Sequence, residues 1–151
     1  MAIFRPTPYS AFPFLVELEP GQGEEVIAGF AEVNGLSSEI TVAEHRFGNA
    51  PVNYVTKVPG IHKTGDITLK RGIIGATNIW EWLDQTRNGS LASKRNIVIK
   101  LQSEDRSDVV VSWKLIGCFP MKWTGPALNA KGGGDVAMEE LTLAAEHITQ
   151  E

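Results

Sequence analysis

The chain has little of what marks a secreted, membrane-spanning or nucleic-acid-binding protein. It contains one cysteine among 151 residues, so it has no internal disulfide framework. No apolar run approaches the roughly 20 residues that a transmembrane helix requires. Prolines interrupt the N-terminal MAIFRPTPYSAFPF, where a signal peptide needs an unbroken apolar stretch, so we expect no signal peptide and assembly in the cytoplasm. A net charge of -4 argues against the basic face of a nucleic-acid binder.

A recognisable catalytic or metal-binding constellation is also missing. The histidines His45, His62 and His147 have no metal-ligand spacing. Cys118 lies in an apolar run with nothing nearby to lower its pKa, which favours an inert core thiol over a nucleophile. The run KGGGD lacks the Gly-Lys-Ser/Thr end of a phosphate-binding loop. We therefore expect no enzyme activity and no cofactor.

Four tryptophans, Trp80, Trp82, Trp113 and Trp123, leave a second interpretation open. They would suit the pocket of a small-ligand β-barrel carrier, although in a domain of this size tryptophan is more often part of the core. A hydrolase is a further alternative. It requires a carboxylate or histidine whose loss abolishes turnover while the fold stays intact.

The residues that are present indicate a mainly β, α+β domain. Length and composition suit one domain over 1–151. Alternating or β-branched runs predict strands over 12–19, 25–36, 37–47, 66–73, 95–104 and 108–120. We expect the first two to form a hairpin across the turn at 20–23, and the last two to form another. Residues 48–60 are expected to project as a hairpin or loop, and 121–135 to be irregular.

Residues 78–88 are the one predicted helix. Asn78 suits an N-cap with Glu81 three residues on, and Gly89 supplies a left-handed stop. The last segment, 136–148, fits helical spacing and period two, and its composition alone favours a helix.

The strand at 66–73, after a turn at Pro59–Gly60, has one apolar and one polar face. Ile67 and Leu69 point one way, while Asp66, Thr68 and Lys70 point the other. We expect the apolar face to pack under the helix. Long strands with no evident mid-strand proline leave unpaired edges, so we also expect neighbouring copies to share one sheet.

Seven segments, in order and over almost the whole chain, resemble the tail-tube protein family of contractile phages, tailocins and contractile injection systems. They are PYSAFPFLVELE, AGFAEVNGL, KVPGIHKTGDITLKRGI, WEWLDQTRNG, KRNIVIKL, FPMKWTGPALNA and VAMEELTLAAEHI. The resemblance implies an antiparallel β-barrel-like tail-tube domain with one packed helix, related in fold to the haemolysin-coregulated protein of type VI secretion. It also implies that the last segment is a strand, which we adopt over the helical interpretation.

The same resemblance implies a mechanical function. Homohexameric rings would stack into a hollow tube, with a sheath protein, baseplate and tube-initiator proteins as partners and protein or DNA cargo in the lumen, without specific nucleic-acid readout. The expected oligomer and ring-stacking residues are Arg46, Tyr54, Lys57, His62 and Lys63. Those expected at the lumen or the seam between subunits are Asp66, Thr68 and Lys70, with Arg71 turned towards the helix.

Overall fold

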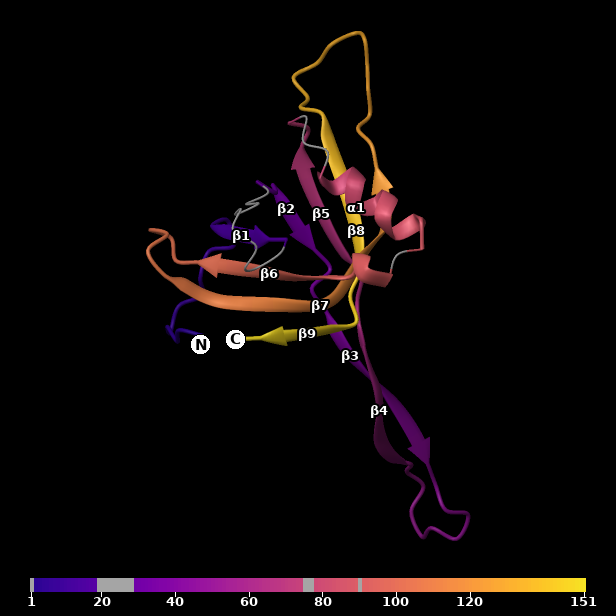
Figure 1. The fold of residues 1–151 in the computed structure, drawn as a ribbon. Helices are drawn as coiled ribbons and strands as arrows, with labels where there is room; N and C mark the ends of the chain where they lie inside the picture. Colours follow the sequence, from indigo (N-terminus) through magenta and orange to yellow (C-terminus); the bar gives the residue numbers. More distant parts are fainter. Residues whose placement is uncertain (1, 19–28, 75–77, 90) are drawn as a thin grey trace.

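The protein is mainly β with one helix, as the sequence predicts (Figure 1). The computed structural model describes residues 2–18, 29–74, 78–89 and 91–151. Its elements are β1 (Phe14–Glu17), β2 (Glu32–Asn34), β3 (Ser38–His45), β4 (Thr56–Thr64), β5 (Ile67–Gly72), α1 (Asn78–Arg87), the 3-10 turn η1 (Leu91–Ser93), β6 (Arg95–Gln102), β7 (Val109–Thr124), β8 (Met138–Ala144) and β9 (His147–Gln150).

Seven strands form one antiparallel sheet in the order β1-β6-β7-β8-β5-β2, and β9 also pairs with β7. The long strand β7 joins two parts of this sheet. Its first half lies between β6 and β9, and its second half pairs with β8. Gly117, with a φ of 67°, stands where the pairing changes. The body is barrel-like but not closed, because β1 and β2 are the two ends of the strand order. Strands β3 and β4 form a separate hairpin.

The core lies under the concave side of the sheet and beneath α1. On β5 burial alternates, with Ile67 and Leu69 inaccessible to solvent, and Leu141 and Leu143 on β8 face the same core. Trp82 brings the helix onto this core. Its ring is 1% exposed, and its Nε1 donates a hydrogen bond to the Ser93 carbonyl oxygen at 2.6 Å. The expected packing of the β5 apolar side and the helix in one core is confirmed.

Only the C-terminal end of α1 matches the prediction. Gly89 has a φ of 81°, and its N–H donates to the Thr86 carbonyl oxygen at 3.1 Å, so the helix stops where expected. Asn78 is the first residue of the helix rather than the residue before it. Its side-chain oxygen accepts a hydrogen bond from Arg71 Nη2 at 3.1 Å, so the expected capping role of Asn78 is not seen.

The predicted hairpin of 12–19 with 25–36 is wrong for the described residues. β1 pairs with β6, placing Phe14 opposite Leu101, whereas β2 pairs with β5. Alternation fixes which face of a strand is buried but not which strand lies beside it. The turn at 20–23 and the rest of 19–28 lie outside the described residues.

Three boundaries also differ from expectation. Pro59 and Gly60 lie inside β4 rather than in a turn, and a register shift between Ile40 and Val42 of β3 accommodates them. Such a mid-strand proline is tolerated because, among the described strands, β4 is hydrogen-bonded to β3 alone and its other side is an edge. β7 continues to Thr124, into the stretch expected to be irregular. Residues 138–144 are a strand with period-two burial, so the strand that the family implies is confirmed and the compositional preference for helix is wrong.

Candidate assembly surfaces

A long hairpin, here called the arm, projects from the body (Figure 1). It consists of β3, the tip at 46–55 and β4, and every side chain from 38 to 63 except Ala50 is exposed. Large apolar side chains are among them, including Ile40, Val42, Tyr54 and Ile61. A two-stranded ribbon without a covered apolar face is only marginally stable in water. The apolar side chains of the arm are therefore left without cover in the single chain.

The sequence-predicted interface residues all lie on this arm. Arg46 and Tyr54 are in the tip, where Arg46 Nη2 donates to the Ala50 carbonyl oxygen at 3.5 Å. Lys57, His62 and Lys63 lie on β4. The register places Lys57 opposite Glu44 and Lys63 opposite Glu39, so two lysines of β4 face two glutamates of β3 across the ribbon. The expected projection at 48–60 thus forms only part of a longer structure that includes β3.

The root of the arm is held in a defined direction. Gly65 N–H donates to the Ser37 carbonyl oxygen at 3.1 Å, and the His62 ring lies 5.5 Å from the His147 ring on β9. Gly35 has a φ of 88°, and a Cβ at this position would lie 2.1 Å from the Asp66 carbonyl oxygen. Only glycine allows the chain to pass this close.

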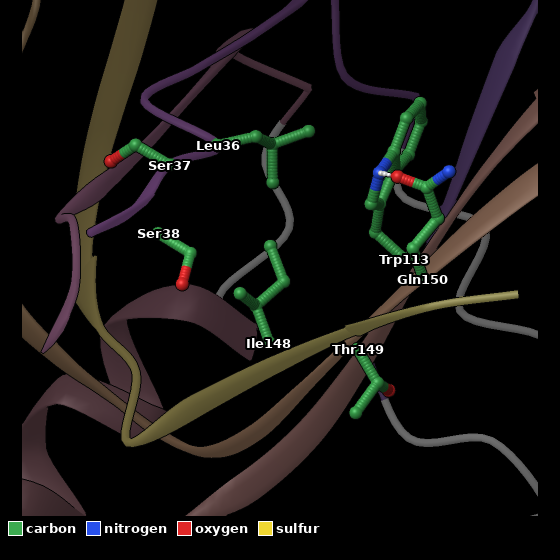
Figure 2. A pocket seen from close by; sticks show the side chains of 7 residues that line it. All are labelled: Leu36, Ser37, Ser38, Trp113, Ile148, Thr149 and Gln150. Atoms are coloured by element: carbon green, nitrogen blue, oxygen red, sulfur yellow. Dashed lines mark hydrogen bonds between the residues drawn. The ribbon is translucent and has the colours of Figure 1, made fainter. Parts of the chain in front are cut away.

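A pocket of about 270 Å³ lies beside the root (Figure 2). Leu36, Ser37 and Ser38 form one wall, while Trp113 and Ile148 belong to the opposite strands β7 and β9. The four tryptophans do not share this pocket. Trp82 is in the core, and the Trp80 and Trp123 rings pack against each other at 5.1 Å. Their distribution does not support the tryptophan-lined cavity of a ligand carrier.

The outer side of the sheet formed by β2, β5, β8 and the second half of β7 carries a block of polar side chains, here called the polar face. Cross-strand register aligns it in two rows: Glu32, Lys70, Glu140 and Thr124 in one, and Asn34, Thr68, Thr142 and Lys122 in the other. Lys70 Nζ lies 3.7 Å from Glu32 Oε2. Two carboxylates and two ammonium groups leave this face with balanced formal charge.

The predicted lumen or seam residues fall on or beside the polar face. Thr68 and Lys70 project from it, and exposed Asp66 lies just before β5. Arg71 points the other way and is 2% exposed. Its Nε donates to Glu139 Oε1 at 2.5 Å, and its link to Asn78 ties the sheet to α1, as the alternation predicts.

Two strand edges bound the polar face. Within the described ranges, β2 has β5 as its only partner, and β7 from 119 to 124 has only β8, because β6 stops pairing at Cys118. These edges lie at opposite ends of the same four-stranded surface. Sequence reasoning expected free edges but missed which strands carry them, because the partners of β1 and β2 were assigned wrongly.

The groups that would do chemistry are inert or scattered. Burial, with a smaller contribution from the Glu146 charge, raises the pKa of the Cys118 thiol to about 12, which opposes formation of the thiolate. Over the part of the chain that the structure describes, no three His, Cys, Asp or Glu side chains are grouped to hold a metal ion. No helix in that same part is long and apolar enough to span a membrane.

Both the sequence and the fold of this chain match known proteins. The family described as T4-like virus tail tube protein gp19 matches residues 10–149. The chain belongs to this tail tube family. The resemblance found in the sequence is thereby confirmed over nearly the whole chain.

Several solved structures are similar to this chain over more than nine tenths of both chains. A chain of the anti-feeding prophage tube-terminating cap is 28% identical, with a TM-score of 0.83 over 100% of this chain and 95% of that one. A chain of the PVC sheath-tube complex, an extracellular contractile injection system in its extended state, is 26% identical, with a TM-score of 0.81 over 95% and 91%. Hcp1 from Flavobacterium johnsoniae shares the fold alone, at 15% identity and a TM-score of 0.53 over 92% and 94%. No curated protein matches the chain.

Proposed function

We propose that the protein, as a single domain over 1–151, is the inner-tube subunit of a contractile particle and forms hexameric rings that stack into a hollow tube. The observation that carries the proposal is the pair of free edges at opposite ends of the polar face. Pairing of β2 from one copy with 119–124 of the next joins unlike edges, and such a head-to-tail contact generates a ring when the rotation closes. Six copies per ring is the number that the family resemblance implies.

Two kinds of interaction stabilise the seam between neighbouring subunits. Each backbone hydrogen bond between the joined edges contributes about 0.5–1.5 kcal/mol net, and apolar area buried at the seam adds roughly 25 cal/mol per Å². Both occur once per subunit, so a closed ring leaves neither of these two edges unpaired. The polar face of each copy then lines the lumen, with Thr68 and Lys70 among the lining side chains.

The balanced lumen suits transport. Because two carboxylates and two ammonium groups cancel on the polar face, protein or DNA passes without the counterion release that a basic channel would produce. The arm carries Arg46, Tyr54, Lys57, His62 and Lys63 to an adjacent copy. A sheath protein surrounds the tube and drives it through a target envelope. A baseplate and a tube-initiator protein start tube assembly. The subunit has a structural role and no catalytic one. The related structures named for sheath-tube and baseplate complexes support these partners.

The test exploits the unlike edges. Asn34 on β2 and Lys122 on β7 are exposed, lie on the polar face and are each at one edge of it. A double Asn34→Cys, Lys122→Cys variant treated with a short bismaleimide is expected to give a ladder that ends at six chains. Either single variant is expected to give no cross-linked species, because like edges do not meet. Dimers from a single variant, or monomers alone at high concentration with no rings by negative-stain microscopy, contradict the proposal.

A further inference from the structure

Two histidines far apart in the sequence meet where β4 passes β9 (Figure 1). His62 lies on β4 and His147 is the first residue of β9, so sequence spacing gives no sign of the pair. Their ring centres are 5.5 Å apart, and the ring planes are inclined at 63°. His62 is exposed and His147 is half-buried, so ions in the solvent reach both rings.

The separation of the rings is close to that of two imidazoles bound to one metal ion. A Zn–N bond is about 2.0–2.1 Å long, so two ring nitrogens at the tetrahedral angle lie about 3.3 Å apart and their ring centres about 5 Å apart. The χ2 torsion of histidine is broad, and rotation about it turns one nitrogen of each ring towards such an ion. The backbone of β4 and β9 therefore already holds the two rings at a chelating distance.

The surroundings of the rings are compatible with a cation. Cross-strand register places His62 opposite Ile40, and the adjacent Lys63 points to the other face of the ribbon. His147 pairs with an isoleucine of β7. On the side of β4 that carries His62, Thr64 Oγ1 is buried and has no hydrogen-bond partner among the described residues. A hydroxyl oxygen has two lone pairs and accepts a hydrogen bond from a metal-bound water.

We propose that His62 and His147 form a binding site for one divalent transition-metal ion of the zinc, nickel or copper type. Imidazole nitrogens bind these ions, whereas Mg²⁺ and Ca²⁺ prefer oxygen ligands. The two rings supply two ligands, water fills the other positions, and Thr64 Oγ1 accepts a hydrogen bond from one of these waters. Because β4 and β9 belong to separate sheets, the ion cross-links the arm to the body. The site does not depend on the proposed tube function.

An ion at this site stabilises the folded chain, because the two rings meet only when β4 lies beside β9. A ligand that binds the folded state alone raises its stability further as the ligand concentration exceeds Kd. Zn²⁺ or Ni²⁺ is therefore expected to raise the midpoint of thermal unfolding in a concentration-dependent way, and excess EDTA is expected to remove the effect. Mg²⁺ at the same concentrations is expected to leave the midpoint unchanged.

The third histidine of the chain supplies a matched control. His45, at the other end of β3, packs against Phe47 with ring centres 4.7 Å apart. ZnCl₂ is titrated by calorimetry into the untagged chain and into His62→Gln, His147→Gln and His45→Gln. The unsubstituted chain and His45→Gln are expected to bind one ion per chain with the same affinity. Loss of His62 or His147 is expected to weaken binding by about tenfold or more, since even the loss of a group behind a metal ligand costs about 10–100-fold. Cys118 is fully buried and does not compete for the ion.

Three results overturn the site: no binding by the unsubstituted chain, unchanged binding in both His62→Gln and His147→Gln, or equal weakening in His45→Gln. One ion per two chains also overturns it, because the ion then bridges copies. Should a variant fail to fold in EDTA, Cu²⁺ below one equivalent is added to the unsubstituted chain. It is expected to broaden the ring NMR signals of His62 and His147 before those of His45, and equal broadening of all three contradicts the proposal. None of these results bears on the tube function, which the edge cross-link tests.

Discussion

Arg71 and Glu139 form a buried ion pair where β5 and β8 pass beneath the start of α1. Their side chains are 3% and 12% exposed, and Glu139 also accepts a hydrogen bond from Trp123 Nε1 at 3.2 Å. Lys70, the neighbour of Arg71, lies on the polar face instead. The two adjacent cations therefore have different functions: one fastens the helix to the sheet, and the other faces solvent in the single chain.

Removing the buried cation is expected to destabilise the fold strongly. Arg71→Leu leaves the Glu139 carboxylate buried without its cation, which costs about 3–5 kcal/mol of unfolding free energy. Urea denaturation followed by tryptophan fluorescence measures it. Arg87→Leu is the control, because Arg87 is mostly exposed. It forms a surface ion pair with Asp84, for which about 0–1 kcal/mol is expected, and its guanidinium lies over the Trp80 ring at 5.3 Å. Equal losses of unfolding free energy in both variants contradict this account. A double Arg71→Leu, Glu139→Leu variant that is no more stable than Arg71→Leu contradicts it as well.

The glycine at the root of the arm is expected to be irreplaceable. Gly35→Ala forces a left-handed backbone onto a residue with a Cβ and drives that Cβ against the Asp66 carbonyl oxygen, so we expect a loss of about 1–3 kcal/mol. Gly48→Ala, in the arm tip, meets nothing within 4 Å and is expected to be neutral. Thermal unfolding of the two variants side by side gives the comparison, and a stable Gly35→Ala variant would show that the root has freedom to move.

The N-terminal segment is expected to loosen in acid. The Arg5 guanidinium, hydrogen-bonded to both Glu104 oxygens at 2.9 and 3.0 Å, lowers the pKa of the Glu104 carboxyl to about 2, with help from the Ser10 N–H. Because folding lowers this pKa, the stabilisation from the Arg5–Glu104 ion pair, here called the tether, is fully present above the ordinary pKa of 4.5. It is lost as the pH falls towards 2. An NMR titration of the Glu104 carboxyl is expected to give a midpoint near 2, and Arg5→Gln is expected to move it up towards 4.5. An unchanged midpoint in Arg5→Gln rules out the tether.

The sequence predicts which face of a strand is buried better than it predicts which strand pairs with it. The alternation of Ile67 to Lys70 gave the buried and polar sides of β5, because side-chain direction is a local property of a strand. The partners of β1 and β2 depend on contacts far along the chain, such as Phe14 with Leu101, and no local pattern specifies them. Pro59 and Gly60 carry the composition of a turn, yet lie in a ribbon whose outer edge needs no hydrogen bond. The strand β8 was predicted only through the family resemblance, because the composition of 136–148 alone favours a helix.

Charge on the polar face is expected to decide whether DNA slides or sticks in the assembled tube. Glu32→Gln with Glu140→Gln removes both carboxylates of the row that holds Lys70 and leaves Lys70 and Lys122 in place, so each subunit gains two net positive charges on this face. Ammonium groups without compensating anions bind phosphates by releasing counterions, an effect that falls steeply as salt rises. Tubes of this variant are therefore expected to retain short single-stranded DNA at about 50 mM salt and release it by about 200 mM.

The matched control changes the same charge elsewhere. Glu81→Gln with Asp84→Asn removes two carboxylates from α1, so the net charge of the subunit is the same as in the polar-face variant while the polar face is unaltered. If the polar face lines the lumen, DNA in polar-face tubes is also protected from an added nuclease, because the enclosed strand is out of reach. Equal retention by both variants would mean that overall charge and not the lumen binds DNA. Retention by the polar-face variant without nuclease protection would place that face on the outside of the assembly, and the ring would have to be built with the sheet reversed.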